Sequence, residues 1–137
     1  MKPFQIYLAM LIIIELILSV YIAHGQYINE ILCIGGKGCA LVQSSDYGEF
    51  LGVKTSVWGV IAFTFLFIFY GWAHNSYKRY RFFLAATLLG SLASVRFLAI
   101  QAFILKTYCT SCLIADFLML VIAVLSYVEF CKLRKYY

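Results

Sequence analysis

The feature that most constrains this chain is a set of four long apolar windows, each close to the length of a membrane-spanning helix. A helix needs roughly 20 mostly apolar residues to cross about 30 Å of hydrocarbon. Together the windows occupy most of the 137 residues, and they run from Phe4 to Ala23, Val57 to Ala73, Phe82 to Leu105 and Cys109 to Phe130. The sequence therefore predicts an all-α membrane protein, a bundle of four transmembrane helices with a long outward loop between the first and second.

Composition argues against any soluble domain. Hydrophobic residues make up 64% of the chain and charged residues 12%, whereas soluble domains are about half apolar and about a quarter charged. A signal peptide is the alternative for the first window, because "YIAHGQ" has small residues near its end. However, the apolar core exceeds the usual length of about 7 to 15 residues and contains Glu15. We expect residues 1–137 to form a single integral membrane domain.

Lysine and arginine gather on one predicted side of the membrane. Seven of them lie in the N-terminus, the "YKRYR" connection and the C-terminal tail, against three lysines on the other side. Positive charge in short loops tends to stay cytoplasmic. We therefore expect both termini in the cytoplasm, with segments 25–56 and 106–108 facing outward. The net charge of +5 then reflects membrane topology and contact with lipid headgroups, with no role in nucleic-acid binding.

Four of the five cysteines, Cys33, Cys39, Cys109 and Cys112, fall on the outward side, and Cys131 lies at the cytoplasmic end. Disulfides persist outside a plasma membrane and inside the endoplasmic reticulum, so four outward cysteines are most economically two pairs. Cys33 and Cys39 enclose "IGGKG", whose glycines let a short loop close. A small exposed loop gains little from cross-linking, so this pair favours thiol–disulfide exchange over a structural role, which remains the alternative.

The motif Cys109-Thr-Ser-Cys112 stands where the fourth window begins. Unpaired N–H groups and the positive end of the dipole at a helix start favour a thiolate, so the pair is suited to redox chemistry. The same spacing also occurs as half of a zinc site. We expect no metal here, because His24 and His74 fall near opposite membrane faces.

The arrangement resembles the vitamin K epoxide reductase family, including its bacterial and archaeal quinone-reducing homologues. The matching stretches are "CIGGKGC" after the first window, "SSDYGEFLGVKTSVWG" before the second and "YCTSC" at the fourth. Disulfide bond formation protein B has the reverse order of cysteine pairs. Many prokaryotic members carry a fused thioredoxin-like domain, which we do not expect here. The chain thus resembles a single-domain prokaryotic member whose thiol partner is a separate protein.

This resemblance implies an electron path. Cys33 exchanges with an extracytoplasmic thioredoxin-like protein, Cys39 relays to Cys109, and Cys112 faces a membrane quinone of the ubiquinone, menaquinone or vitamin K type. The chain would then be a quinone-dependent thiol oxidase that supports disulfide bond formation. We expect it in a prokaryotic plasma membrane, or in the endoplasmic reticulum if the source is eukaryotic.

The resemblance also implies quinone contacts. Ser45 follows the second loop cysteine by six positions, as a serine or threonine does in the family. Thr55 stands where the animal enzymes have a quinone-contacting asparagine, and Ser56 matches a small polar residue before the second helix. Trp58 is an aromatic candidate for an apolar pocket, as are the phenylalanines at 63 and 117. Asp116 replaces a tyrosine that contacts vitamin K, which weighs against the epoxide as substrate.

Three ionisable residues, Glu15, Arg96 and Asp116, lie well inside the windows at membrane depth, where each costs several kcal/mol unless paired. Glu15 and Arg96 sit at similar depth below the outward ends of their windows, so we expect them to pair and fix helix packing. Asp116 lies one turn below Cys112 on the same helix face. It could deliver protons to a quinone or contact Arg96.

Two other functions compete with the thiol oxidase. The first is a vitamin K quinone or epoxide reductase on the same core. The second belongs to a different class, a non-enzymatic four-span transporter or assembly protein whose disulfides are structural.

Overall fold

A computed structural model describes residues 3–28 and 38–136. It contains four long helices, each long and apolar enough to cross a membrane: α1 (Pro3–Ile28), α3 (Thr55–Ala73), α4 (Tyr77–Ala99) and α5 (Thr110–Tyr136). The predicted all-α bundle with four spans is confirmed.

The helices are longer than the apolar windows. α1 continues past Ala23 to Ile28, α4 begins at Tyr77 and α5 continues to Tyr136. Hydropathy marks only the part of a helix at hydrocarbon depth, whereas backbone hydrogen bonding continues through polar residues into the interface. The "YKRYR" stretch, expected as a connection, is therefore the first turn and a half of α4.

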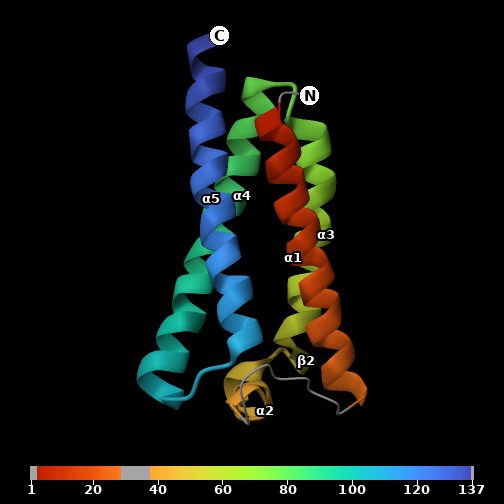
Figure 1. Cartoon of the computed structure of the whole chain (residues 1–137), viewed down its shortest axis with the longest axis vertical. Coiled ribbons are helices and arrows are strands. Elements are labelled where there is room, and N and C mark those ends of the chain that lie inside the picture. Colours follow the sequence, from red (N-terminus) through yellow and green to blue (C-terminus); the bar gives the residue numbers. More distant parts are fainter. Residues whose placement is uncertain (1–2, 29–37, 137) are drawn as a thin grey trace.

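Successive long helices run in opposite directions (Figure 1). Both termini and the turn between α3 and α4 lie at one end, which we call the basic end because residues 77–81 and the C-terminal tail supply its positive charge. The other end, which we call the cysteine end, carries α2 and the connection from α4 to α5. α1 packs mainly on α3 and α5, and α4 packs mainly on α5.

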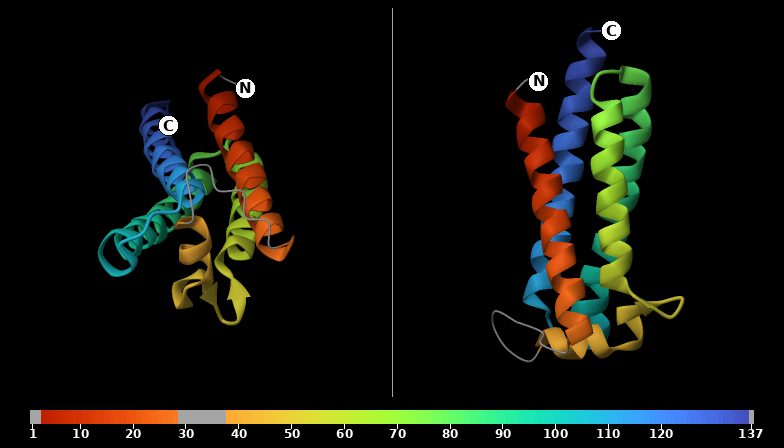
Figure 2. Two further views of the ribbon diagram at one scale, coloured as in Figure 1. Left: turned by 60° about the horizontal axis from the view of Figure 1, so that its bottom comes forward. Right: turned by 90° about the vertical axis from the view of Figure 1, so that its right-hand side faces the viewer.

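The predicted outward loop contains regular structure in its described part. It forms α2 (Gly38–Ser44), a 3₁₀ turn (Asp46–Gly48) and a hairpin of two short strands, β1 (Glu49–Phe50) and β2 (Val53–Lys54). Leu51 and Gly52 both have positive φ, 54° and 75°, as a two-residue type I′ turn requires. The hairpin leads directly into α3, and α2 with the hairpin lies across the cysteine end of the bundle (Figure 2).

The best-packed core lies in the half of the bundle toward the basic end. Tyr70 and Tyr80 flank Phe83, with ring centroids 5.1 and 5.4 Å from its ring. The Glu129 carboxylate is inside this cluster and accepts hydrogen bonds from the hydroxyls of Tyr80 at 3.0 Å and Tyr70 at 3.4 Å. Leu8 and Ile12, both fully buried, complete the contact from α1. Because side chains fill this half of the bundle, a site for a small molecule is expected in the other half, toward the cysteine end.

Candidate functional site

The chain turns sharply just before the Cys-x-x-Cys motif. α4 continues as a π-helix over Ile100–Leu105, a form often found at functional sites, and ends at Lys106 in the left-handed region with φ 50°. The buried side chain of Gln101 accepts a hydrogen bond from the backbone N–H of Cys109 at 2.9 Å. Its backbone carbonyl accepts another from Thr107 at 3.3 Å. Gln101 therefore fixes the position of Cys109 at the start of α5.

The two cysteines of the motif share a set of hydrogen bonds. The backbone N–H of Cys112 donates to the sulfur of Cys109 at 3.3 Å. The side-chain amide of Gln43, on α2, lies 3.7 Å from the sulfur of Cys109 and 4.0 Å from that of Cys112. Both thiols are free; Cys109 is fully buried and Cys112 is partly exposed. We call residues 38–54, which lie across the cysteine end, the cap, and we call Cys109 and Cys112 the inner pair. An amide from the cap thus reaches both sulfurs of the inner pair.

These hydrogen bonds favour a thiolate at Cys109. The thiol of Cys112 donates to its sulfur, and the N–H groups of Cys112 and Ser111 and the Gln43 amide add to this effect. Although burial acts in the opposite direction, the pKa of Cys109 is lowered to about 7. Thiol–disulfide exchange requires a thiolate, so Cys109 can react near neutral pH.

We expect the reduced protein to show a thiolate that forms as pH rises through about 7. At pH 7 roughly half of Cys109 should be ionised, against about 3% for a thiol with a pKa near 8.5. The measurement is the ultraviolet thiolate absorbance as a function of pH. The step should disappear in Cys109→Ser and move to higher pH in Gln43→Leu. A Cys109-dependent step centred at 8.5 or above would contradict the hydrogen-bond argument.

The outer cysteine pair is close to this site. Cys39, on α2, is fully buried and disulfide-bonded, and its predicted partner Cys33 lies outside the described residues. Gly38 packs against the backbone of Tyr108, so that a Cβ at Gly38 would stand 2.2 Å from the Tyr108 carbonyl oxygen. Gly38 and Tyr108 are in contact, and the residues that immediately follow them in the sequence are Cys39 and Cys109.

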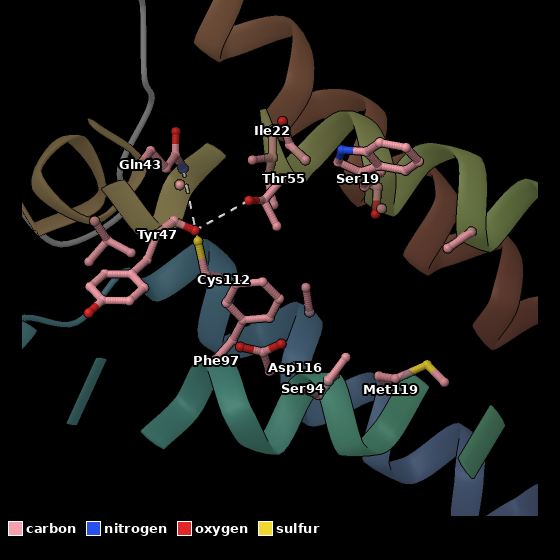
Figure 3. A pocket seen from close by; sticks show the side chains of 18 of the residues that line it. Ser19, Ile22, Gln43, Tyr47, Thr55, Ser94, Phe97, Cys112, Asp116 and Met119 are labelled. Atoms are coloured by element: carbon pink, nitrogen blue, oxygen red, sulfur yellow. Dashed lines mark hydrogen bonds between the residues drawn. The ribbon is translucent and has the colours of Figure 1, made fainter. Parts of the chain in front are cut away.

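A cavity of about 310 Å³ opens beside Cys112, between the four long helices and beneath the cap (Figure 3). Its wall is mainly apolar, and its volume falls in the range of small-molecule sites. Cys112 and Asp116 of α5 and Ser94 of α4 lie on one side, with Ser19 of α1 and Thr55 of α3 on the other. The arrangement can hold a flat apolar molecule against a redox-active sulfur.

Four of the five predicted quinone contacts line this cavity: Thr55, Ser56, Trp58 and Asp116. Ser45 does not. Its hydroxyl donates to the carbonyl of Val42 at 2.7 Å, at the end of α2. Of the other two aromatic candidates, Phe63 lines the cavity, whereas Phe117 is 64% exposed on the outside of α5.

Two of these lining residues also hold the cap in place, and a third joins α3 to α1. Thr55 donates to the carbonyl of Tyr47 at 3.4 Å, and the indole N–H of Trp58 donates to that of Phe50 at 3.1 Å. Ser56 donates to the side-chain oxygen of Gln26 on α1. The start of α3 therefore fixes both the cavity wall and the hairpin above it.

Sequence reasoning missed the glutamines. Gln26, Gln43 and Gln101 all line the cavity and hydrogen-bond to other site elements. Gln101 had a usable signal, since a polar side chain inside an apolar window must find a partner. Gln43 had none, because nothing in the sequence predicts that α2 reaches the cysteines.

The expected Glu15–Arg96 pair is wrong. Glu15 is fully buried, and neither carboxylate oxygen has a hydrogen-bond partner within residues 3–28 and 38–136. Arg96 is exposed on the outer face of α4. Equal depth did not ensure that the two face each other, because Arg96 lies about 200° around the helix from the buried Ser94 at 100° per residue.

A known protein family matches the sequence over the residues that build this site. A model of the vitamin K epoxide reductase family matches residues 6–127, nearly the whole chain. The chain belongs to the vitamin K epoxide reductase family. Membership makes it an integral membrane protein and an oxidoreductase that links disulfide chemistry to quinones. No curated protein matches the chain significantly.

The region that matches the vitamin K epoxide reductase family includes every described residue of the site. The match begins before Ser19 on α1 and ends after Met119 on α5, which are the first and last lining residues in the sequence. The cavity, the cap and the inner cysteine pair are therefore all part of the family's domain.

Proposed function

We propose that this protein is a membrane thiol oxidase that supports disulfide bond formation. Electrons enter from an extracytoplasmic thioredoxin-like protein at Cys33 and Cys39, pass to Cys109 and Cys112, and leave to a membrane quinone. The observation that carries this proposal is the position of Cys112 in the wall of an apolar cavity, with its sulfur beside the amide of Gln43. A quinone is lipid-soluble, so its reductant must stand at the boundary between water and hydrocarbon.

The relay proceeds by two exchanges of disulfides. The partner's dithiol reduces the Cys33–Cys39 disulfide and becomes a disulfide itself. The Cys39 thiolate then attacks Cys109 of the oxidised inner pair, Cys112 leaves as a thiolate, and Cys33 resolves the mixed disulfide. The contact between Gly38 and Tyr108 supports this order, because it holds the residues next to each reacting sulfur together.

The last step transfers two electrons to the quinone. The dithiol of Cys109 and Cys112 loses two electrons and two protons as its S–S bond forms, and the quinone gains two electrons and two protons to become a hydroquinone. Cys112 is the pair's member in the cavity wall, and it is the sulfur that faces the quinone. Thr55, Ser56, Trp58 and Asp116 orient the ring, whereas Ser45 holds α2.

The distribution of positive charge supports an orientation. Both termini and the turn between α3 and α4 lie at the basic end, which we infer to be cytoplasmic. The cysteine end then faces outward, which suits a partner that forms disulfides in an oxidising compartment. A prokaryotic plasma membrane fits this arrangement.

The test uses purified full-length protein, reduced thioredoxin as the thiol donor and a short-chain benzoquinone followed by its absorbance. We expect quinone loss that depends on both the protein and the thiol, with one quinone reduced per disulfide formed. Cys131→Ser serves as the matched control, because this thiol lies near the basic end of α5, and its rate should equal that of the wild type. Absence of thiol-dependent quinone loss would overturn the proposal. If the protein reduced quinone with dithiothreitol as the donor but not with thioredoxin, the role of the inner pair would stand and the thioredoxin-like partner would be rejected.

A further inference from the structure

We propose that Gln43 is a further catalytic residue of the relay, whose side-chain amide stabilises the negative charge on each sulfur of the inner pair as that sulfur leaves during disulfide exchange. Cys112 leaves first and Cys109 second, and one amide nitrogen serves both departures. The inference rests on the proposed exchange between the outer and inner cysteine pairs.

The amide nitrogen of Gln43 is placed to donate to both sulfurs. It lies 3.7 Å from the sulfur of Cys109 and 4.0 Å from that of Cys112, and it faces Cys112 in the wall of the cavity (Figure 3). An amide NH₂ group carries two hydrogens, one for each sulfur. Hydrogen bonds to a charged acceptor are roughly twice as strong as those to a neutral one. The amide therefore stabilises a thiolate more than a thiol.

The two sulfurs differ in the other donors that they receive. Cys109 also accepts a hydrogen bond from the backbone N–H of Cys112 at 3.3 Å, and the Cys112 thiol donates to it as well. Among residues 3–28 and 38–136, only the Gln43 amide donates to the sulfur of Cys112. The charge on a departing Cys112 therefore depends on Gln43 more strongly than the charge on Cys109 does.

A comparison with the other two glutamines of the cavity wall sets Gln43 apart from a structural amide. The side-chain oxygen of Gln26 accepts from Ser56, and that of Gln101 accepts from the backbone N–H of Cys109. The side-chain oxygen of Gln43 is buried and has no partner in the described part of the chain. A buried acceptor without a partner is unfavourable. Packing alone does not account for this orientation, whereas a role of the nitrogen at the sulfurs does.

The helix that carries Gln43 also carries the attacking cysteine. Cys39 and Gln43 are four residues apart on α2, so they lie on the same face of this helix. α2 packs on α5, and Gly38 contacts Tyr108 directly before the inner pair. When α2 is docked, it therefore presents the sulfur that attacks together with the amide that supports the sulfur that leaves.

The proposed role fits both exchange steps. The Cys39 thiolate attacks Cys109, the Cys109–Cys112 bond breaks, and Cys112 becomes the thiolate, so that one S–S bond replaces another without net oxidation. The Cys33 thiolate then attacks Cys39, and Cys109 leaves as a thiolate beside the same amide. A thiol leaves faster when its thiolate is more stable. Gln43 thus lowers the barrier of both transfers.

The test needs neither quinone nor thioredoxin. Full-length Cys33→Ser, oxidised to a single disulfide, can exchange its Cys109–Cys112 bond for a Cys39–Cys109 bond. Acid quenching, alkylation and mass spectrometry of peptides give the ratio of the two forms at mildly alkaline pH, where the free sulfur is a thiolate. We expect Gln43→Leu, added to this variant, to lower the share of the Cys39–Cys109 form by about 10-fold, the lower range for a lost hydrogen bond to a charged group.

Two further variants separate this role from packing of α2. Ser44→Ala is the matched control, because Ser44 is exposed on the same helix and its hydroxyl bonds to the carbonyl of Leu41. Its ratio should equal that of Cys33→Ser alone. Gln43→Lys supplies a different donor on a chain of different shape, and it should retain the Cys39–Cys109 form. An equal loss in Gln43→Lys and Gln43→Leu, or no loss in Gln43→Leu, would overturn the proposal.

An equilibrium with glutathione distinguishes failure of this inference from failure of the proposed function. Thiolates exist only in the reduced inner pair, so Gln43 stabilises that form. Gln43→Leu should make the inner disulfide about 10-fold harder to reduce, equivalent to about 30 mV, and Ser44→Ala should match the wild type. If Cys33→Ser forms no Cys39–Cys109 bond, the proposed relay fails. An inner-pair equilibrium that Gln43→Leu leaves unchanged rejects the role of Gln43, whether or not the protein reduces quinone.

Discussion

Replacing Cys112 with alanine is expected to reduce quinone turnover by on the order of 10³-fold or more, because the two sulfurs of a redox pair act as one unit. The remaining thiol of Cys109 cannot form the inner disulfide, so two electrons have no route to the cavity. Cys39 then has no oxidised inner pair to attack, and the relay from the outer pair stops. The measurement is quinone absorbance in the presence of excess reduced thioredoxin.

A variant that also lacks Cys33 offers a structural readout. Mild oxidation of the double variant Cys33→Ala, Cys112→Ala should trap a disulfide between Cys39 and Cys109, because neither resolving thiol is present, and mass spectrometry of cross-linked peptides detects it. The wild type should release this disulfide through Cys33 or Cys112. Cys131→Ser, also a cysteine of α5 but near the basic end, should show neither effect. Retained quinone turnover in Cys112→Ala would reject the assignment of this sulfur as the electron donor.

Gly38→Ala should slow the relay from the outer to the inner cysteine pair by about 10- to 100-fold. The added Cβ would stand 2.2 Å from the carbonyl oxygen of Tyr108, and a backbone atom cannot move aside as the end of a flexible side chain can. α2 must therefore shift away from the segment that carries Cys109. A displacement near 1 Å at reacting atoms can cost about 100-fold in rate.

Two donors separate this effect from general damage. Turnover with reduced thioredoxin should fall, whereas dithiothreitol, which can reduce the inner pair directly, should still support quinone reduction. Gly71→Ala on α3 is the matched control, since its added Cβ would meet no atom within 4 Å. Equal loss with both donors would mean that the substitution disturbs the quinone cavity and not the relay.

The fold was predictable because hydropathy acts at the level of whole helices. A bilayer requires about 20 apolar residues per span, and this requirement leaves a clear signal in the sequence. The position of Cys109 and Cys112 at the start of the last span was predictable for the same reason. Family resemblance then supplied four residues that the structure finds around the cavity: Thr55, Ser56, Trp58 and Asp116.

What could not be predicted depends on helix rotation and on the cap. Depth along a helix follows from counting residues, but the direction that a side chain faces depends on packing against its neighbours. For this reason Arg96 was assigned to the interior although it is exposed. The contact of Gln43 with both sulfurs also requires α2 to lie across the bundle, a long-range arrangement with no local pattern in the sequence.

The tyrosine–glutamate cluster described above gives the molecule a gradient of rigidity. At the basic end, Tyr70 and Tyr80 tie α3 and α4 to Glu129 of α5, and Tyr70 also bonds to the backbone of Gln5 on α1. Hydrogen bonds of this cluster thus join all four long helices at the basic end. We therefore expect a lipid-soluble molecule to enter between the helices at the opposite end, where Cys112 lines the cavity.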